Sequence, residues 1–240
     1  MSDALPALTL SADLLAEAER ELVTIRDWMR FCVSCFRGCD VHIGHGTSDP
    51  FAEASALVLQ TLNLEWSADE EILSARLLPS ERAAIAETLR KRVNERTPLA
   101  YLLNLAYFNG LPFYVDERVL VPRSPIAELI QDRFLPWLKD EPQRILDLCT
   151  GSGCIAIACA KEFPDAVVDA TDLSLDALSV AAINVEHHDL QERVGLLESD
   201  VFSKLPGQRY DLIVSNPPYV DAEDMADLPE EFLREPEMGL

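Results

Sequence analysis

The stretch that most constrains the fold runs from residue 144 to residue 160 and reads RILDLCTGSGCIAIACA. It starts with a short apolar run, interrupted by Asp147, as expected for a strand buried in a parallel sheet. Residues 150–153 (TGSG) then form a tight turn, and the small apolar residues after them predict a helix. This order is typical of a nucleotide-binding corner, because glycines let the backbone approach a ligand and the helix N–H groups point at it. Alone the signal is weak, since such turns occur in many α/β proteins.

Two later motifs sharpen this interpretation. The predicted strand 166–171 is followed by Asp172, at the distance of about 20 residues where doubly wound folds place an acid on ribose hydroxyls. The predicted strand 210–215 runs directly into Asn216-Pro217-Pro218-Tyr219. With this motif the chain resembles class I S-adenosylmethionine-dependent methyltransferases that modify planar NH2 groups.

Strands and helices alternate regularly in the second half of the chain. We expect strands at 145–149, 166–171, 194–198 and 210–215, and helices at 153–163, 174–188 and briefly around 203. Such alternation requires a parallel sheet with right-handed crossovers. The expected fold class is therefore α/β with a mostly parallel sheet, preceded by a small all-α domain and a β-hairpin linker. The resemblance implies that this sheet is the Rossmann-like fold of a class I S-adenosylmethionine methyltransferase, here incomplete.

The first half of the chain reads as helical. Apolar residues at three- and four-residue spacing predict one long helix from Ser11 to about Arg37. Further helices are expected from Asp49-Pro50, near 69–75 and from Ser80 to about Glu95. Asn109-Gly110 predicts a β-hairpin turn, and Ser124-Pro125 starts a helix expected to run towards Trp137. These patterns divide the chain into a helical domain (1–98), a linker with a β-hairpin (99–123) and an α/β domain (124–240). The resemblance implies that the helical domain recognises substrate and that the α/β domain is the methyltransferase domain, truncated before its last strands.

The composition limits the partners. The formal net charge is −22, and so acidic a surface repels phosphate backbones and attracts basic polypeptides. We therefore expect a basic protein substrate and no direct DNA binding. No apolar run exceeds the seven residues 154–160, so we expect no membrane span. The start, MSDALPALTL, lacks the basic region and cleavage pattern of a signal peptide, so we expect a cytoplasmic protein.

Two clusters in the helical region have open roles. The spacing of Cys32, Cys35, Cys39, His42 and His45 resembles a metal site only loosely, and Cys32 falls on the apolar stripe of its helix, so we expect no metal. A second cluster is basic and comprises Arg90, Lys91, Arg92 and Arg96. We interpret it as a solvated helix face, with contact to RNA or an acidic partner as the alternative.

Several motifs together resemble the HemK/PrmC family of protein glutamine methyltransferases, over nearly the whole chain. They are Tyr101-Leu102, Phe108-Asn109-Gly110, Val121-Pro122-Arg123, Glu128, residues 147–153 and residues 216–219. Release-factor enzymes of this family usually carry PRPDTE after the hairpin, whereas this chain has PRSPIAE. That variant, with residues 44–47 (GHGT) and Cys149 in the turn, resembles the PrmB branch, which methylates a glutamine of a large-subunit ribosomal protein.

The resemblance implies a role for each motif. The cofactor-binding residues would be Asp147, Thr150, Gly151, Ser152, Gly153, Cys154, Asp172, Asp200, Val201 and Asn216. Among these, Asp147 would face the ammonium of S-adenosylmethionine, Asp172 both ribose hydroxyls and Asp200 the adenine amino group, with Val201 or Phe202 covering the ring. No bound metal is implied.

The substrate-binding residues would be Asn216, Pro217, Pro218, Tyr219, Arg123 and Glu128. Catalysis would fall to Asn216, Pro217 and Tyr219. The Asn216 side-chain carbonyl and the Pro217 backbone carbonyl would each accept one N–H of the substrate amide, while Tyr219 stacks on its plane. Arg123 and Glu128 would shape the entrance.

Three alternatives stay open from the sequence. One is a release-factor glutamine methyltransferase, and a second is an enzyme for adenine amino groups of nucleic acid, which the acidic charge disfavours. The third is a shortened, inactive cofactor-binding fragment, because class I enzymes normally continue beyond the fourth strand, which here would be an exposed edge. The target glutamine and the oligomeric state are not determined.

Overall fold

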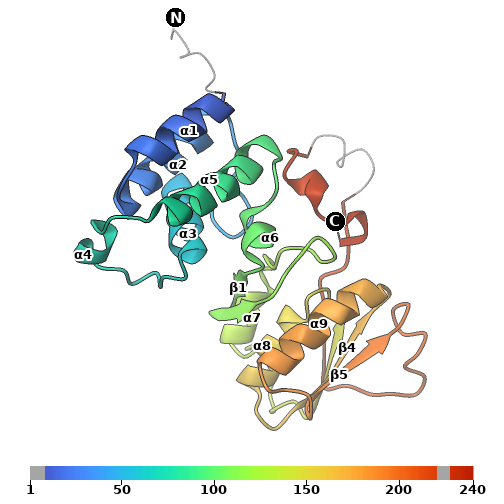
Figure 1. The fold of residues 1–240 in the computed structure, drawn as a ribbon. Coiled ribbons are helices and arrows are strands. Elements are labelled where there is room, and N and C mark those ends of the chain that lie inside the picture. The colour runs from blue at the N-terminus through green and yellow to red at the C-terminus, as the bar shows by residue number, and fades with distance from the viewer. Residues whose placement is uncertain (1–8, 221–227, 240) are drawn as a thin grey trace, which may run out of the picture. The chain divides into compact units, whose positions relative to one another are not determined.

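The computed structural model describes residues 9–220 and 228–239. The chain forms two compact units (Figure 1). One comprises Met1–Leu103 with Pro229–Arg234, and the other comprises Asn104–Leu228 with Glu235–Leu240. Within the described ranges, no helix is both long enough and apolar enough to cross a membrane.

The first unit is helical. Its elements are α1 (Ala12–Glu21), α2 (Ile25–Gly38), α3 (Pro50–Thr61), α4 (Glu70–Leu73), α5 (Pro79–Asn94), α6 (Leu99–Leu103) and the 3-10 turn η1 (Phe232–Arg234). Ser11 and Asp49 are confirmed as helix caps, because their side chains accept backbone N–H groups at the starts of α1 and α3. Asp69 caps α4 in the same way. Local sequence therefore sets where these helices begin.

The prediction of one long helix from Ser11 to Arg37 is wrong. The chain breaks between α1 and α2, where Thr24 and Asp27 form a capping box in which each side chain accepts the other's backbone N–H. Leu77 also donates its N–H to the Val23 carbonyl. The hydrophobic spacing stays in phase across the break, so periodicity alone did not detect it.

The core of the helical unit contains two of the cysteines. Cys32 and Cys35 are fully buried beside Trp28 and Phe36. Burial raises the pKa of both thiols, that of Cys35 to about 12. They act as small apolar side chains. In the described part of the chain, no group of three or more His, Cys, Asp or Glu is placed to hold a metal ion.

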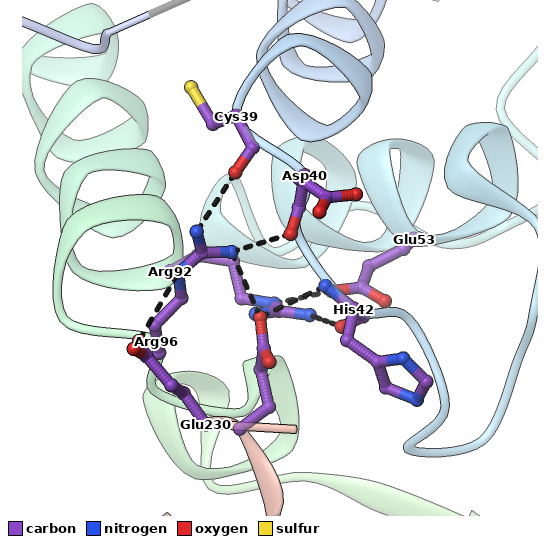
Figure 2. Close-up of polar contacts among 8 residues, drawn as sticks. Cys39, Asp40, His42, Glu53, Arg92, Arg96 and Glu230 are labelled. Carbon is purple, nitrogen blue, oxygen red and sulfur yellow. Dashed lines mark hydrogen bonds and ion pairs between the residues drawn. The ribbon is translucent and has the colours of Figure 1, made fainter. Parts of the chain in front are cut away.

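A buried ion-pair cluster lies in the same unit (Figure 2). Arg92 on α5 is 1% exposed; its Nε lies 2.5 Å from Glu53 Oε1 on α3, and its Nη2 donates to the His42 carbonyl at 2.7 Å. Glu231 comes from the segment before η1. Its Oε1 lies 3.6 Å from Arg92 Nη1 and 3.2 Å from Arg96 Nη1, and accepts the His42 N–H. We name Arg92, Arg96, Glu53 and Glu231 the buried ion-pair cluster.

The solvated-face interpretation of the basic cluster is therefore wrong for Arg92. Arg90 and Lys91 pair with exposed Glu87, as a solvated face would. Arg92 instead turns into the unit, where two carboxylates from distant parts of the chain neutralise it. Glu53 and Glu231 are far from Arg92 in sequence, so the local charge pattern could not reveal that Arg92 is buried and paired.

The second unit contains the sheet. Its elements are β1 (Ala106–Phe108), β2 (Leu111–Phe113), α7 (Ile126–Gln131), β3 (Arg144–Leu148), α8 (Cys154–Glu162), β4 (Val167–Asp172), α9 (Leu175–His187), β5 (Val194–Glu198), β6 (Leu212–Ser215) and the 3-10 turn η2 (Glu237–Gly239). The hairpin β1–β2 is confirmed, with Asn109 and Gly110 both at positive φ. The four expected strands form one sheet of order β5-β4-β3-β6, all parallel.

Apolar side chains cover both faces of this sheet. On one face, α8 and α9 pack side by side and bury Ile145 and Val168 (Figure 1). On the other, Leu146 and Leu148 pack against Leu205. Because side chains alternate along a strand, β3 contributes to both layers. Among the described strands, β5 and β6 lie at the two edges.

Two helix predictions in this unit need correction. The helix expected from Ser124 towards Trp137 ends at Gln131, because Arg133 and Phe134 adopt positive φ. The Arg133 guanidinium there pairs with Glu141 and Glu162. The brief helix expected around residue 203 is a set of turns.

Candidate functional site

A cavity of about 800 Å³ lies in the sheet-containing unit. Its lining comes from segments around residues 117–124, 149–155, 171–177, 199–201, 216–218 and 236–239. Four of these segments follow β3, β4, β5 and β6 directly, so the cavity lies at the carboxyl ends of the parallel strands. This is where open α/β sheets bind ligands, and the volume suits a nucleotide-sized molecule.

Asp147 lies beneath the glycine turn and has no exposed surface. Its Oδ2 accepts the Thr150 hydroxyl at 2.6 Å and the Ala156 N–H at 3.1 Å, while Oδ1 has no hydrogen-bond partner. Asp147 is not among the lining residues. Its visible role is to join the end of β3, the turn and the first turn of α8.

Burial raises the Asp147 pKa from 3.8 to about 7. The folded state therefore binds this proton more tightly than the unfolded state, so the group favours folding at low pH and this contribution is lost as pH rises from about 4 to 7. Asp147→Asn is expected to remove this slope from the pH profile of the unfolding free energy, measured by urea denaturation. An unchanged slope would contradict the assignment.

The turn itself needs glycine. Gly151 and Gly153 adopt φ +53° and +80°. A Cβ on Gly153 would lie 3.2 Å from the Ala181 Cβ on α9, whereas one on Gly151 meets no atom within 4 Å. Gly153 therefore serves both the left-handed backbone and the close packing of α9 on the turn.

Gly153→Ala is expected to lower the free energy of unfolding by about 2–3 kcal/mol, through backbone strain and overpacking. Gly207→Ala is the matched control, because Gly207 has φ +74° with no atom within 4 Å of its added Cβ. Thermal denaturation of both variants isolates the packing contribution. Equal losses of stability in the two variants would show that the close approach of the added Cβ to Ala181 does not destabilise the fold.

Asp172, at the end of β4, holds the other side of the turn. Its Oδ2 accepts the Gly151 N–H and its Oδ1 accepts the Ser174 N–H, both at 2.9 Å. The carboxylate lines the cavity. Since a carboxylate offers about four acceptor positions, two are left for ligand hydroxyls.

Asp200 and Val201 line the cavity after β5. Val201 has φ +47°, a costly conformation for a β-branched residue and one that clusters at functional sites. The buried Ser199 hydroxyl donates to the Val201 carbonyl and accepts the Lys204 N–H, which holds this loop. Sequence reasoning missed Ser199. Phe202 does not line the cavity.

Asn216, Pro217 and Pro218 form the wall at the end of β6. Their position is set by the Ser215 hydroxyl, which donates to the Leu148 carbonyl at 2.9 Å and ties the ends of β6 and β3 together. Asn216 Oδ1 lies 3.4 Å from the Ser124 hydroxyl. Tyr219 is 79% exposed and does not line the cavity.

Arg123 lines the cavity but is engaged by a partner that the sequence did not suggest. Its two Nη atoms donate to Glu235 at 2.8 and 2.7 Å, and Glu235 Oε1 also accepts the Val121 N–H. Glu235 is buried. Arg123 thus anchors the segment that leads into η2, and Glu128 is exposed on α7 outside the lining.

Comparison with known proteins places these features in a family. Residues 132–240 match the model of the methyltransferase small domain. The chain is 50% identical over 226 residues to the ribosomal protein uL3 glutamine methyltransferase of Neisseria gonorrhoeae, covering 93% of this chain and 75% of that one. The Neisseria meningitidis protein of the same name is also 50% identical, at 93% and 74% coverage. The chain belongs to the family of ribosomal protein uL3 glutamine methyltransferases.

One solved structure is similar to part of this chain. It is an S-adenosyl-L-methionine-dependent methyltransferase from Methanococcus maripaludis, 28% identical, with a TM-score of 0.34 over 38% of this chain and 42% of that one. The chain has the class I methyltransferase fold, with a parallel sheet covered by helices.

The cavity fits the S-adenosylmethionine of class I enzymes. A methionine moiety needs close approach to backbone, which the open space over Gly151 permits. A ribose needs acceptors, which Asp172 retains, and a cation is favoured beside Asp172 and Asp200. Of the residues expected to bind the cofactor, Thr150, Gly151, Ser152, Cys154, Asp172, Asp200, Val201 and Asn216 line the cavity.

Proposed function

We propose that this chain methylates the side-chain amide nitrogen of a glutamine in ribosomal protein uL3, with S-adenosylmethionine as methyl donor. The observation that carries the proposal is that one cavity is lined both by the glycine turn with Asp172 and by Asn216 with Pro217. A donor and an amide bound there would share one cavity.

The residues at the end of β6 suit a carboxamide. Its nitrogen is planar and weakly nucleophilic because the lone pair is delocalised. The Asn216 side-chain carbonyl and the Pro217 backbone carbonyl are both acceptors, and proline brings no competing N–H. Hydrogen bonds to the two amide hydrogens strengthen as positive charge develops on nitrogen, so they favour the transition state over the ground state.

Bound S-adenosylmethionine supplies a methyl group on a positively charged sulfur. That chemistry would move the methyl carbon from sulfur to the amide nitrogen, leaving S-adenosylhomocysteine and releasing one amide proton to solvent. The turn, Asp172 and Asp200 would orient the donor, while Asn216 and Pro217 direct the amide nitrogen for in-line transfer. Arg123, held by Glu235, would stabilise the cavity lining rather than bind substrate.

The net charge of −22 favours a basic protein substrate. We assign recognition of that protein to the helical region, residues 1–98. A ribosomal protein substrate also implies action in the cytoplasm.

The test is methyl transfer itself. The purified chain is incubated with methyl-labelled S-adenosylmethionine and unmethylated uL3, a release factor or DNA, and the label is located by mass spectrometry. We expect label on one glutamine of uL3. Preferential labelling of the release factor or of DNA would overturn the proposal.

A further inference from the structure

Asn184 on α9 is a fully buried polar side chain outside the lining of the cavity. Its Nδ2 donates to the Ser152 carbonyl at 2.9 Å and to the Tyr114 carbonyl at 3.0 Å, and its Oδ1 accepts the Tyr114 N–H at 2.7 Å. Both amide hydrogens are therefore used. A leucine could fill the same space in an apolar core but could not make these hydrogen bonds. The role of the amide is therefore to join Ser152 and Tyr114.

The first connection is to the glycine turn. Ser152 lines the cavity, and the bond from Asn184 fixes the orientation of its peptide group. One turn of helix earlier, Ala181 lies so close to Gly153 that a Cβ added there would be 3.2 Å from the Ala181 Cβ. Helix α9 thus holds the turn at two adjacent points, by packing at Gly153 and by a hydrogen bond at Ser152.

The second connection is to residues 114–118, of which Glu117 and Arg118 line the cavity, and which we call the Tyr114–Arg118 wall. After Tyr114, the buried Asp116 carboxylate accepts the Tyr114 hydroxyl at 2.9 Å and the Arg118 guanidinium, and Arg118 lines the cavity. The Arg118 guanidinium lowers the pKa of Asp116, which keeps this pair charged. The backbone that carries this wall is held at Tyr114 by two hydrogen bonds to Asn184.

We propose that Asn184 is a positioning residue that fixes the glycine turn against the Tyr114–Arg118 wall and so sets the affinity for the methyl donor. This inference rests on the proposed function for the identity of the ligand. Asn184 touches neither Asn216 nor Pro217 in any described hydrogen bond, so its effect falls on donor binding more than on transfer.

The test uses Asn184→Asp, which keeps the shape but removes the Nδ2 donor and leaves two buried carbonyls unpaired. We expect the Kd for S-adenosylhomocysteine, measured by calorimetry on the folded full chain, to rise about tenfold. The KM for S-adenosylmethionine should rise in parallel, with a smaller change in kcat. Asn184→Ser, which keeps one donor on a smaller side chain, provides a second variant and should give an intermediate Kd.

Asn104→Asp is the control, at an exposed asparagine that bonds to the same wall. Asn104 Nδ2 donates to the carbonyl of Val115, next to Tyr114, but makes no bond to the turn. It should lower stability without changing the Kd. Normal ligand affinity in both Asn184 variants, or an equal loss in the Asn104 variant, would overturn this inference alone. Failure of the unaltered chain to bind would overturn the proposed function as well.

Discussion

Asn216→Ala is expected to lower kcat for methyl transfer by about 10²–10³-fold, by analogy with the loss of one preorganised hydrogen-bonding group that stabilises developing charge. The reason is that the Asn216 side chain offers one of the two carbonyl oxygens at the end of β6. The KM for S-adenosylmethionine should change far less, because the turn and Asp172 are untouched. Single-turnover transfer to uL3 with saturating donor measures the effect on the chemical step.

Two variants check the assignment. Asn216→Asp retains an oxygen acceptor and should lose less activity than the alanine variant. Ser124→Ala removes a hydroxyl 3.4 Å from Asn216 Oδ1, too long for a strong hydrogen bond, and should transfer methyl nearly normally. An Asn216→Ala chain with unchanged kcat would rule out the acceptor role.

Arg92→Met is expected to lower the free energy of unfolding by about 3–5 kcal/mol, the loss typical of breaking a buried ion pair. Arg92, Glu53 and Glu231 are 1%, 5% and 2% exposed, so the variant leaves two carboxylates in the interior beside Arg96 as the remaining cation of the buried ion-pair cluster (Figure 2). The His42 carbonyl also loses its donor. Urea denaturation monitored by circular dichroism measures the change.

Arg90→Met, on the same helix, is the control. Arg90 pairs with Glu87 and Glu95 at the surface, where water screens the charges and ion pairs contribute less than about 1 kcal/mol. The buried substitution should therefore cost several times more than the exposed one. Similar losses of unfolding free energy in the two variants would show that burial does not strengthen the Arg92 ion pairs.

Sequence predicted those parts of the fold that depend on neighbours along the chain. Ser11 and Asp49 cap helices, Asn109-Gly110 turns the hairpin, and alternation of strands and helices predicts the parallel sheet. In each case the deciding hydrogen bond or φ value belongs to residues within a few positions of one another.

Contacts between distant residues were not predictable in the same way. Arg92 and Glu53 are 39 positions apart, and Arg123 and Glu235 are 112 apart. Nothing in the local pattern distinguishes these arginines from exposed ones. The Thr24–Asp27 capping box is different, because its spacing is visible in the sequence and was masked by a hydrophobic repeat that continues through it.

The carboxylate of Asp172 has a consequence for how mutations in this pocket are interpreted. Because it ties the Gly151 and Ser174 amides to the end of β4, it is part of the scaffold even before any nucleoside arrives. Substituting Asp172 would remove the hydrogen bonds that hold the glycine turn and would also remove an acceptor for the ligand. A loss of affinity for the nucleoside ligand after such a substitution would therefore reflect both the lost ribose contact and the loosened turn.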